Sequence, residues 1–115
     1  MQTNAIRPFV PSKDFDTSVE FYKALGFEAH VASDNLMLFQ ADSQSFFLQR
    51  FYHKAFAENL MLQWVVTDIE AAAQHFATLQ NLDLEYSPIK EESWGRVIYL
   101  QGPSGELWQV TELHA

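Results

Sequence analysis

Two segments of this chain share one pattern, and they lie 54 positions apart, from Asp14 to Gly26 and from Asp68 to Leu79. Each opens with an aspartate, a residue type favoured at a helix N-cap, and continues with apolar residues at helical spacing. Sliding the first segment onto the second pairs the two aspartates and most apolar positions, including Leu25 with Leu79. The pattern predicts two amphipathic helices within two copies of one structural unit.

Short runs rich in β-branched, aromatic and aliphatic residues flank both predicted helices and predict strands. They cover residues 5–10, 27–31, 36–40 and 46–51 in the first half, and 60–67, 84–89, 96–101 and 106–112 in the second. Residues 52–59 are a polar connection without a periodicity long enough to predict an element. Each half therefore has the element order βαβββ, with module one over about residues 1–51 and module two over about residues 60–115.

The expected architecture follows from the size of these modules. A chain of 115 residues is long enough for one core and is expected to form one domain, residues 1–115. Neither module can bury its own sheet alone, so the two should pair. We expect an α+β fold in which two βαβββ modules form a curved, cup-shaped mixed sheet with both helices outside.

The last two predicted strands enclose Gly-Pro-Ser-Gly at residues 102–105. Proline sets φ at the first central position of a turn and Gly105 accommodates a left-handed conformation, so residues 94–112 are predicted to form a hairpin. This hairpin, ending in Leu-Trp-Gln-Val, resembles the C-terminal signature of the vicinal oxygen chelate superfamily. The stretch from Ser12 to Tyr22 is similar to that superfamily's opening pattern. Its members include glyoxalases, extradiol dioxygenases, fosfomycin-modifying enzymes and bleomycin-binding proteins.

The resemblance implies where a metal would bind, because the superfamily's enzymes hold a divalent ion through His or Glu in the cup. The matching positions here are Arg7, Met61 and Gln109, with Leu48 or Gln49 on the last strand of module one. Arginine keeps its proton, a thioether is a soft ligand and a lone amide binds weakly. We therefore expect no metal and no other cofactor. The alternative is a glyoxalase-type lyase or isomerase that uses a weak site through Gln49, Gln109 or a histidine.

Alternation along strands predicts which side chains face into the cup. The side chains expected to face inward are those of Arg7, Phe9, Met61, Gln63, Val65, Leu107, Gln109 and Thr111. Those expected to pack on the helices are Leu62, Trp64, Val66, Trp108 and Val110. Metal-free members that bind bleomycin have a Trp before a Gly-Arg pair, which Trp94 resembles. The predicted ligand-binding residues are Arg7, Phe9, Met61, Gln63, Trp94, Leu107 and Gln109.

The resulting functional hypothesis is metal-independent binding of a small aromatic or cationic molecule without catalysis, as in antibiotic sequestration. Glu91, Glu92 and Asp34 would hold a cationic tail at the mouth of the cup. Arg7 would either clamp a ligand carboxylate or phosphate or form an ion pair in a homodimer interface, and exposed sheet edges favour such a dimer. A regulatory or protein-interaction module is a third hypothesis.

Composition narrows the remaining classes of function. Fifteen acidic against seven basic residues give a net charge of −8, which disfavours nucleic acid and anionic membranes as partners. The start of the chain lacks the pattern of a signal peptide, so we expect a cytoplasmic protein. The absence of cysteine excludes disulfides and a cysteine nucleophile. Ser104 lies between two strands and is interpreted as a turn residue, and the four histidines share no predicted strand face.

Overall fold

A computed structural model describes residues 1–114. For Gln80 it describes only the backbone. Module one contains β1 (Phe9–Pro11), α1 (Phe15–Ala24), β2 (Glu28–Ser33), β3 (Leu36–Ala41) and β4 (Gln44–Gln49). A helix, α2 (Lys54–Asn59), lies between the modules. Module two contains β5 (Met61–Val65), α3 (Ile69–Ala77), β6 (Glu85–Tyr86), β7 (Lys90–Glu92), β8 (Gly95–Gln101) and β9 (Leu107–Leu113), with a 3-10 turn over Gln80–Leu82.

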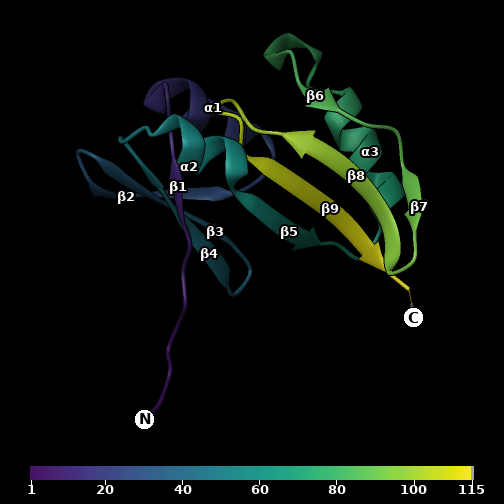
Figure 1. Cartoon of the computed structure of the whole chain (residues 1–115), viewed down its shortest axis with the longest axis horizontal. Coiled ribbons are helices and arrows are strands. Elements are labelled where there is room, and N and C mark those ends of the chain that lie inside the picture. The colour runs from purple at the N-terminus through teal and green to yellow at the C-terminus, as the bar shows by residue number, and fades with distance from the viewer. Residues whose placement is uncertain (115) are drawn as a thin grey trace.

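The two modules have the same sheet topology, which confirms the predicted α+β fold and its internal repeat. Module one has strand order β1-β4-β3-β2 and module two has β5-β9-β8-β6, with β7 pairing to β8. The β1–β4 and β5–β9 pairs are parallel and the other pairs are antiparallel. Figure 1 shows the two sheets next to each other, with α1 packed on the first and α3 on the second.

Both longer helices begin where the repeated aspartates predict. The Asp14 carboxylate accepts a hydrogen bond from the Thr17 amide at 3.1 Å. The Asp68 carboxylate accepts two, from the amides of Glu70 at 3.0 Å and Ala71 at 3.2 Å. Among the residues that the structure describes, no helix is long and apolar enough to cross a membrane.

Three predicted elements differ from the structure. The first strand is shorter than residues 5–10, although the Pro8 carbonyl still accepts a hydrogen bond from the Phe47 amide at 2.9 Å. The connection 52–59 contains α2, which at six residues is too short to show helical periodicity. The predicted strand 84–89 is reduced to the two residues of β6, because Pro88 lacks the N–H that would continue the ladder, and β7, which follows over Lys90–Glu92, was not predicted.

One aromatic core joins the two modules. Trp108 of β9 lies against Tyr22 of α1 with 5.8 Å between ring centroids, and Trp64 of β5 lies 4.7 Å from Phe27. The Tyr22 hydroxyl donates to the Glu106 carboxylate at 2.6 Å and accepts from the Trp108 indole N–H at 2.9 Å. Because Glu106 and Tyr22 are fully buried, these bonds connect the modules in the interior.

The predicted hairpin turn is present and explains why Glu106 sits inside. Gly105 has φ +103°, and its amide donates to the Gly102 carbonyl at 3.2 Å. A Cβ on Gly102 would lie 2.3 Å from the carboxyl carbon of Glu106. The glycine at position 102 therefore leaves the space that the buried glutamate side chain occupies.

Candidate binding site

Four of the predicted binding residues meet on the face of the module-two sheet opposite α3, here called the open face of module two. The register of β5 and β9 places Met61 beside Leu107 and Gln63 beside Gln109. The Gln109 amide nitrogen lies 2.9 Å from the Met61 sulfur. Met61 is 60% exposed, so this cluster offers a thioether and two amides to the solvent side.

Phe9 and Arg7 lie at the corresponding open face of module one, Phe9 on β1 and Arg7 just before it. Phe9 pairs with Phe47 across the β1–β4 ladder, and their ring centroids are 4.9 Å apart. Phe9 is 50% exposed. The Arg7 Nε donates to the Ser45 hydroxyl at 2.9 Å, and the guanidinium carbon is 5.8 Å from the centroid of the Phe47 ring. Our sequence analysis did not select Phe47, although strand alternation from Gln49 would have placed it on this face.

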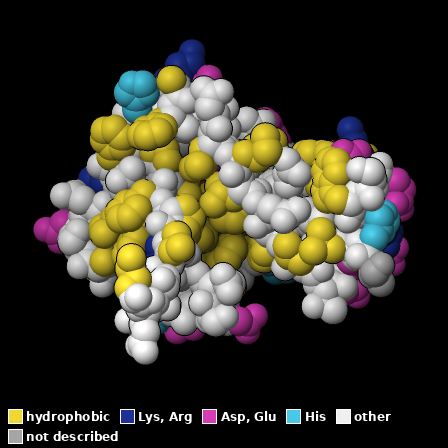
Figure 2. Space-filling model, turned by 60° about the horizontal axis from the view of Figure 1, so that its bottom comes forward, with side chains coloured by type: hydrophobic (Ala, Val, Ile, Leu, Met, Phe, Trp, Pro, Cys, Tyr) yellow, Lys and Arg dark blue, Asp and Glu magenta, His cyan; other side chains and the backbone are white. Residues whose placement is uncertain are grey.

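A groove of about 490 Å³ lies between the modules. Ile6, Pro8 and Ser45 line it from module one, and Gln63 and Val65 line it from module two. The lining also includes four aromatic residues, namely Phe27, Phe46, Trp64 and Trp108. Figure 2 shows hydrophobic side chains on both sides of a hollow and inside it. The groove therefore has aromatic walls next to the open faces.

Trp94 lies apart from the other predicted residues of module two. It precedes β8, whose first residue, Gly95, pairs with Leu113 at one end of β9, whereas Leu107 is at the other end. Because β9 spans seven residues, about 20 Å of strand separate the two ends. Trp94 is 43% exposed, but within one chain it is not brought next to Met61 or Leu107.

The acidic residues near Trp94 are engaged within the protein. Arg96 donates to Glu70 at 3.0 Å and is 3.5 Å from Glu91 and 3.7 Å from Glu112. The hydrogen bond to Glu70 is the main cause of the raised pKa of Arg96. Glu92 accepts a hydrogen bond from the Tyr99 hydroxyl at 2.8 Å, which raises the pKa of that tyrosine. These contacts connect β7 and β8 to the rest of module two.

The donors at the superfamily's metal positions do not fit a divalent ion. Arg7 is a hydrogen-bonded guanidinium, and Met61 and Gln109 contact each other through sulfur and amide nitrogen. Within residues 1–114 no group of three His, Cys, Asp or Glu side chains converges. His30 lies 3.2 Å from Glu28, and the His75 Nε2 lies 2.8 Å from the Ala24 carbonyl. We therefore derive no metal-dependent step from this site.

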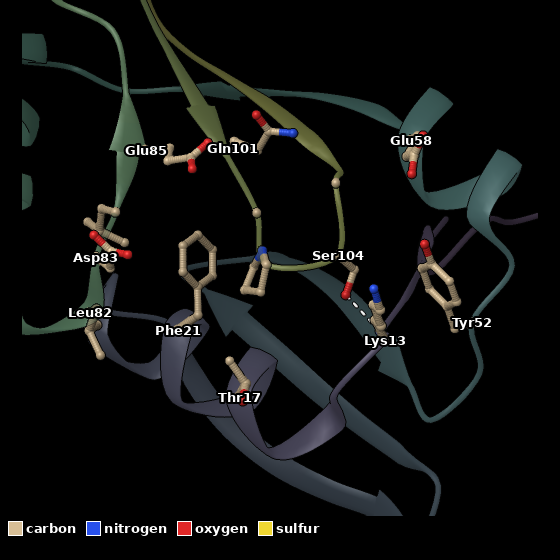
Figure 3. A pocket seen from close by; sticks show the side chains of 14 residues that line it. Lys13, Thr17, Phe21, Tyr52, Glu58, Leu82, Asp83, Glu85, Gln101 and Ser104 are labelled. Atoms are coloured by element: carbon tan, nitrogen blue, oxygen red, sulfur yellow. Dashed lines mark hydrogen bonds between the residues drawn. The ribbon is translucent and has the colours of Figure 1, made fainter.

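A second cavity, of about 400 Å³, lies near the hairpin turn (Figure 3). Phe21 and Tyr52 line it together with Lys13. The Ser104 hydroxyl accepts a hydrogen bond from the Lys13 amide at 2.7 Å, and the Ser104 amide donates to Glu106 at 2.9 Å. Ser104 is therefore used to hold the turn against the start of α1.

Paired βαβββ modules with helices on one side of each sheet define a class of fold, that of the vicinal oxygen chelate superfamily, and this chain has that fold. Its aromatic groove and amide-bearing open face are the features available for binding. No protein-family model and no curated protein matches the chain at the level of sequence.

Solved structures with this fold cover nearly the whole chain. One is the bleomycin-binding protein of Streptomyces verticillus in complex with copper(II)-bleomycin, with TM-score 0.81, 20% identity and 99% of each chain covered. Another is an antibiotic-binding protein, TnmS3, from Streptomyces, with TM-score 0.80, 18% identity and 99% of each chain covered. The fosfomycin resistance protein FosX of Listeria monocytogenes has TM-score 0.75 and 13% identity, covering 99% of this chain and 94% of its own.

Proposed function

We propose that this protein binds a small aromatic molecule between its open faces, without a metal and without catalysis, as in antibiotic sequestration. The observation that carries the proposal is the tilted Phe9–Phe47 ring pair, in which Phe9 is 50% exposed, near an aromatic-walled groove. Aromatic pockets with a few polar groups are typical of small-molecule sites. Burying one planar ring system contributes a few kcal/mol at about 25 cal/mol per Å², which supports micromolar affinity.

The comparisons support the binding part of this proposal. Two of the proteins that share the fold are described as binding an antibiotic, and a third as conferring fosfomycin resistance. The cationic form of the hypothesis has less support, because Glu91 and Glu92 contact Arg96 and Tyr99. Asp34, the third acid expected at the mouth of the cup, lies in the β2–β3 turn. The aromatic character of the ligand is therefore the part that we retain.

We also propose that a second copy of the chain covers the open faces and completes the site. Phe9, Met61, Val65 and Leu113 are each at least half exposed, which is costly for large apolar side chains on neighbouring surfaces. A two-fold dimer would bury the same surface on both copies. Sedimentation equilibrium is the direct measurement, and a monomer at micromolar concentration would contradict this part of the proposal.

A ligand screen tests the proposed function. Thermal shift is measured with bleomycin-like glycopeptides, planar dyes and aromatic acids, each with and without a chelator. A ligand that raises the melting temperature equally in both conditions is expected. Phe9→Ala and Gln109→Ala should remove the shift, whereas Phe56→Ala, which truncates a 68% exposed ring on α2, should leave it unchanged. A shift that requires added divalent metal, or one that survives both open-face variants, contradicts the proposal.

A further inference from the structure

We propose that the aromatic ligand carries a carboxylate, which Arg7 holds while the ring of the ligand lies on the Phe9–Phe47 pair. This inference rests on the proposed function and names the chemical class of its ligand. It follows from how Arg7 is held, from what Arg7 lacks, and from what surrounds it.

Arg7 is positioned by a polar and an aromatic contact. Its Nε donates to the Ser45 hydroxyl at 2.9 Å, and its guanidinium carbon lies 5.8 Å from the Phe47 ring centroid. A guanidinium has five N–H donors, so this hydrogen bond leaves four on the two terminal nitrogens. A planar pair of donors fits the two oxygens of a carboxylate, and a held guanidinium loses less freedom on binding it.

The contacts of the other two arginines show what sets Arg7 apart. Arg96 contacts three carboxylates, and Arg50 stacks on Phe15 at 4.3 Å and donates to the Asp34 carbonyl at 3.3 Å. No ion pair within the described part of the chain includes Arg7. Within that part of the chain Arg50 also has no carboxylate partner, but the ring that it contacts, Phe15, is buried, whereas Arg7 lies beside an exposed aromatic pair.

The surroundings of Arg7 suit an anion with an apolar body. Ser45, which holds Arg7, also lines the groove between the modules, so the guanidinium is at the edge of that groove. On the same sheet face Glu28 is 3.2 Å from His30. Asp42 is the carboxylate that lines the groove, at the β3–β4 turn, and it is the residue that would favour a cationic ligand instead.

Three probes that share one ring system and differ in charge test the inference, namely 2-naphthoate, 2-naphthalenemethanol and 2-naphthylmethylammonium. Isothermal titration at pH 7 and low salt measures their affinities for the full chain. We expect naphthoate to bind at least about tenfold more tightly than the alcohol, because a charge-assisted pair adds to the stacking. Arg7→Gln should reduce naphthoate to the affinity of the alcohol, and Arg7→Lys should retain part of the difference. Arg50→Gln removes the same charge at another position and should change neither the affinity for naphthoate nor that for the alcohol.

Each other outcome overturns the inference, and most leave the proposed function in place. Tightest binding of the ammonium probe, lost in Asp42→Asn, would assign a cationic ligand. Equal binding of all three probes, weakened by Phe9→Ala, would keep an aromatic site without an anion clamp. If none of the probes binds but another ligand gives a metal-independent thermal shift, the aromatic-acid inference is wrong and the proposed binding function still stands. A change of oligomeric state in Arg7→Gln without a change in naphthoate affinity would assign Arg7 to a subunit interface.

Discussion

The two modules have one topology and two different open faces. Module one presents a tilted pair of phenylalanine rings with a guanidinium beside it, whereas module two presents a thioether and two amides. Their strand orders are the same, and both longer helices begin at an aspartate N-cap. The two modules thus share strand order and helix capping, while the side chains on their open faces differ. We conclude that the scaffold and the binding chemistry are encoded by separate sets of residues.

The interiors of the modules differ as well. Tyr22 and Phe76 occupy matching positions in the repeat, and only the tyrosine has a hydroxyl. That hydroxyl reaches Glu106 and Trp108 in module two, while Phe76 packs on Tyr86 within its own module. Module one therefore contributes a buried hydroxyl that joins the two modules. The four predictions below compare the modules in order of expected effect.

The largest effect is expected from Glu106→Ala. This variant leaves the Tyr22 hydroxyl and the Ser104 amide without their buried acceptor and opens a cavity at the junction of the modules. We expect the free energy of unfolding to fall by about 3–5 kcal/mol, measured by urea denaturation at pH 7. Glu58→Ala truncates an exposed glutamate near the same turn and should cost less than about 0.5 kcal/mol. Equal losses in the two variants would show that the buried network does not join the modules.

The next prediction replaces Tyr22 of module one with phenylalanine, the residue type at the matching position of module two. Tyr22→Phe removes both hydroxyl contacts and should cost about 2 kcal/mol at neutral pH. Burial, followed by the nearby Glu106, raises the pKa of Tyr22 well above its ordinary value of 10.0. Above pH 10 the unfolded chain loses this proton while the folded chain keeps it, so stability falls as the pH rises.

The pH dependence gives this prediction its control. Stability measured by urea denaturation between pH 8 and about pH 11 should decline more steeply in the parent protein than in Tyr22→Phe. The pKa of Tyr99 is also raised by its hydrogen bond to Glu92, so Tyr99 contributes to the loss of stability at high pH with the same sign. The variant Tyr99→Phe measures the contribution of Tyr99 separately. Parallel curves for the parent and Tyr22→Phe would contradict the assignment.

The elements that sequence predicted are those with local signals. α1 and α3 follow from an aspartate cap and helical spacing, and the last hairpin follows from Gly-Pro-Ser-Gly. α2 has six residues, too few for periodicity to be visible. Strand alternation correctly grouped Met61, Gln63, Leu107 and Gln109, because β5 and β9 pair without a register shift from Met61–Leu107 to Val65–Thr111.

The parts of the site that sequence did not predict depend on long-range pairing. Phe47 lies beside Phe9 only because β1 and β4 pair in parallel, although the two residues are 38 positions apart in the sequence. The separation of Trp94 from Leu107 depends on the register of β8 and β9. The isolation of Arg7 from acidic partners likewise depends on contacts between distant segments. Residue type suggested Trp94 and Arg7 but not Phe47, and only the fold could place these three side chains.

A smaller effect is expected at the helix caps, where the two modules can be compared directly. Asp14→Ala removes one hydrogen bond from α1, whereas Asp68→Ala removes two from α3. Loss of an N-cap costs about 1 kcal/mol, so both variants should be destabilised, and Asp68→Ala by the larger amount. Urea denaturation measures both. The opposite ranking would show that Glu112, which accepts from the Ile69 amide at 3.1 Å, compensates for the missing cap of α3.

The smallest effect on an isolated chain is expected at the open faces, from Phe9→Ala in module one and Met61→Ala in module two. Both side chains are at least half exposed, so each truncation should change the unfolding free energy of a monomer by less than about 1 kcal/mol. If a second copy covers these faces, the melting temperature depends on protein concentration and both variants weaken that dependence. Calorimetry over a hundredfold range of concentration therefore separates the two cases. A concentration-independent melting temperature in the parent protein would show that no second copy covers Phe9 and Met61, so that only the ligand contacts them. The truncation that reduces ligand affinity more would then identify the module that contributes more to ligand binding.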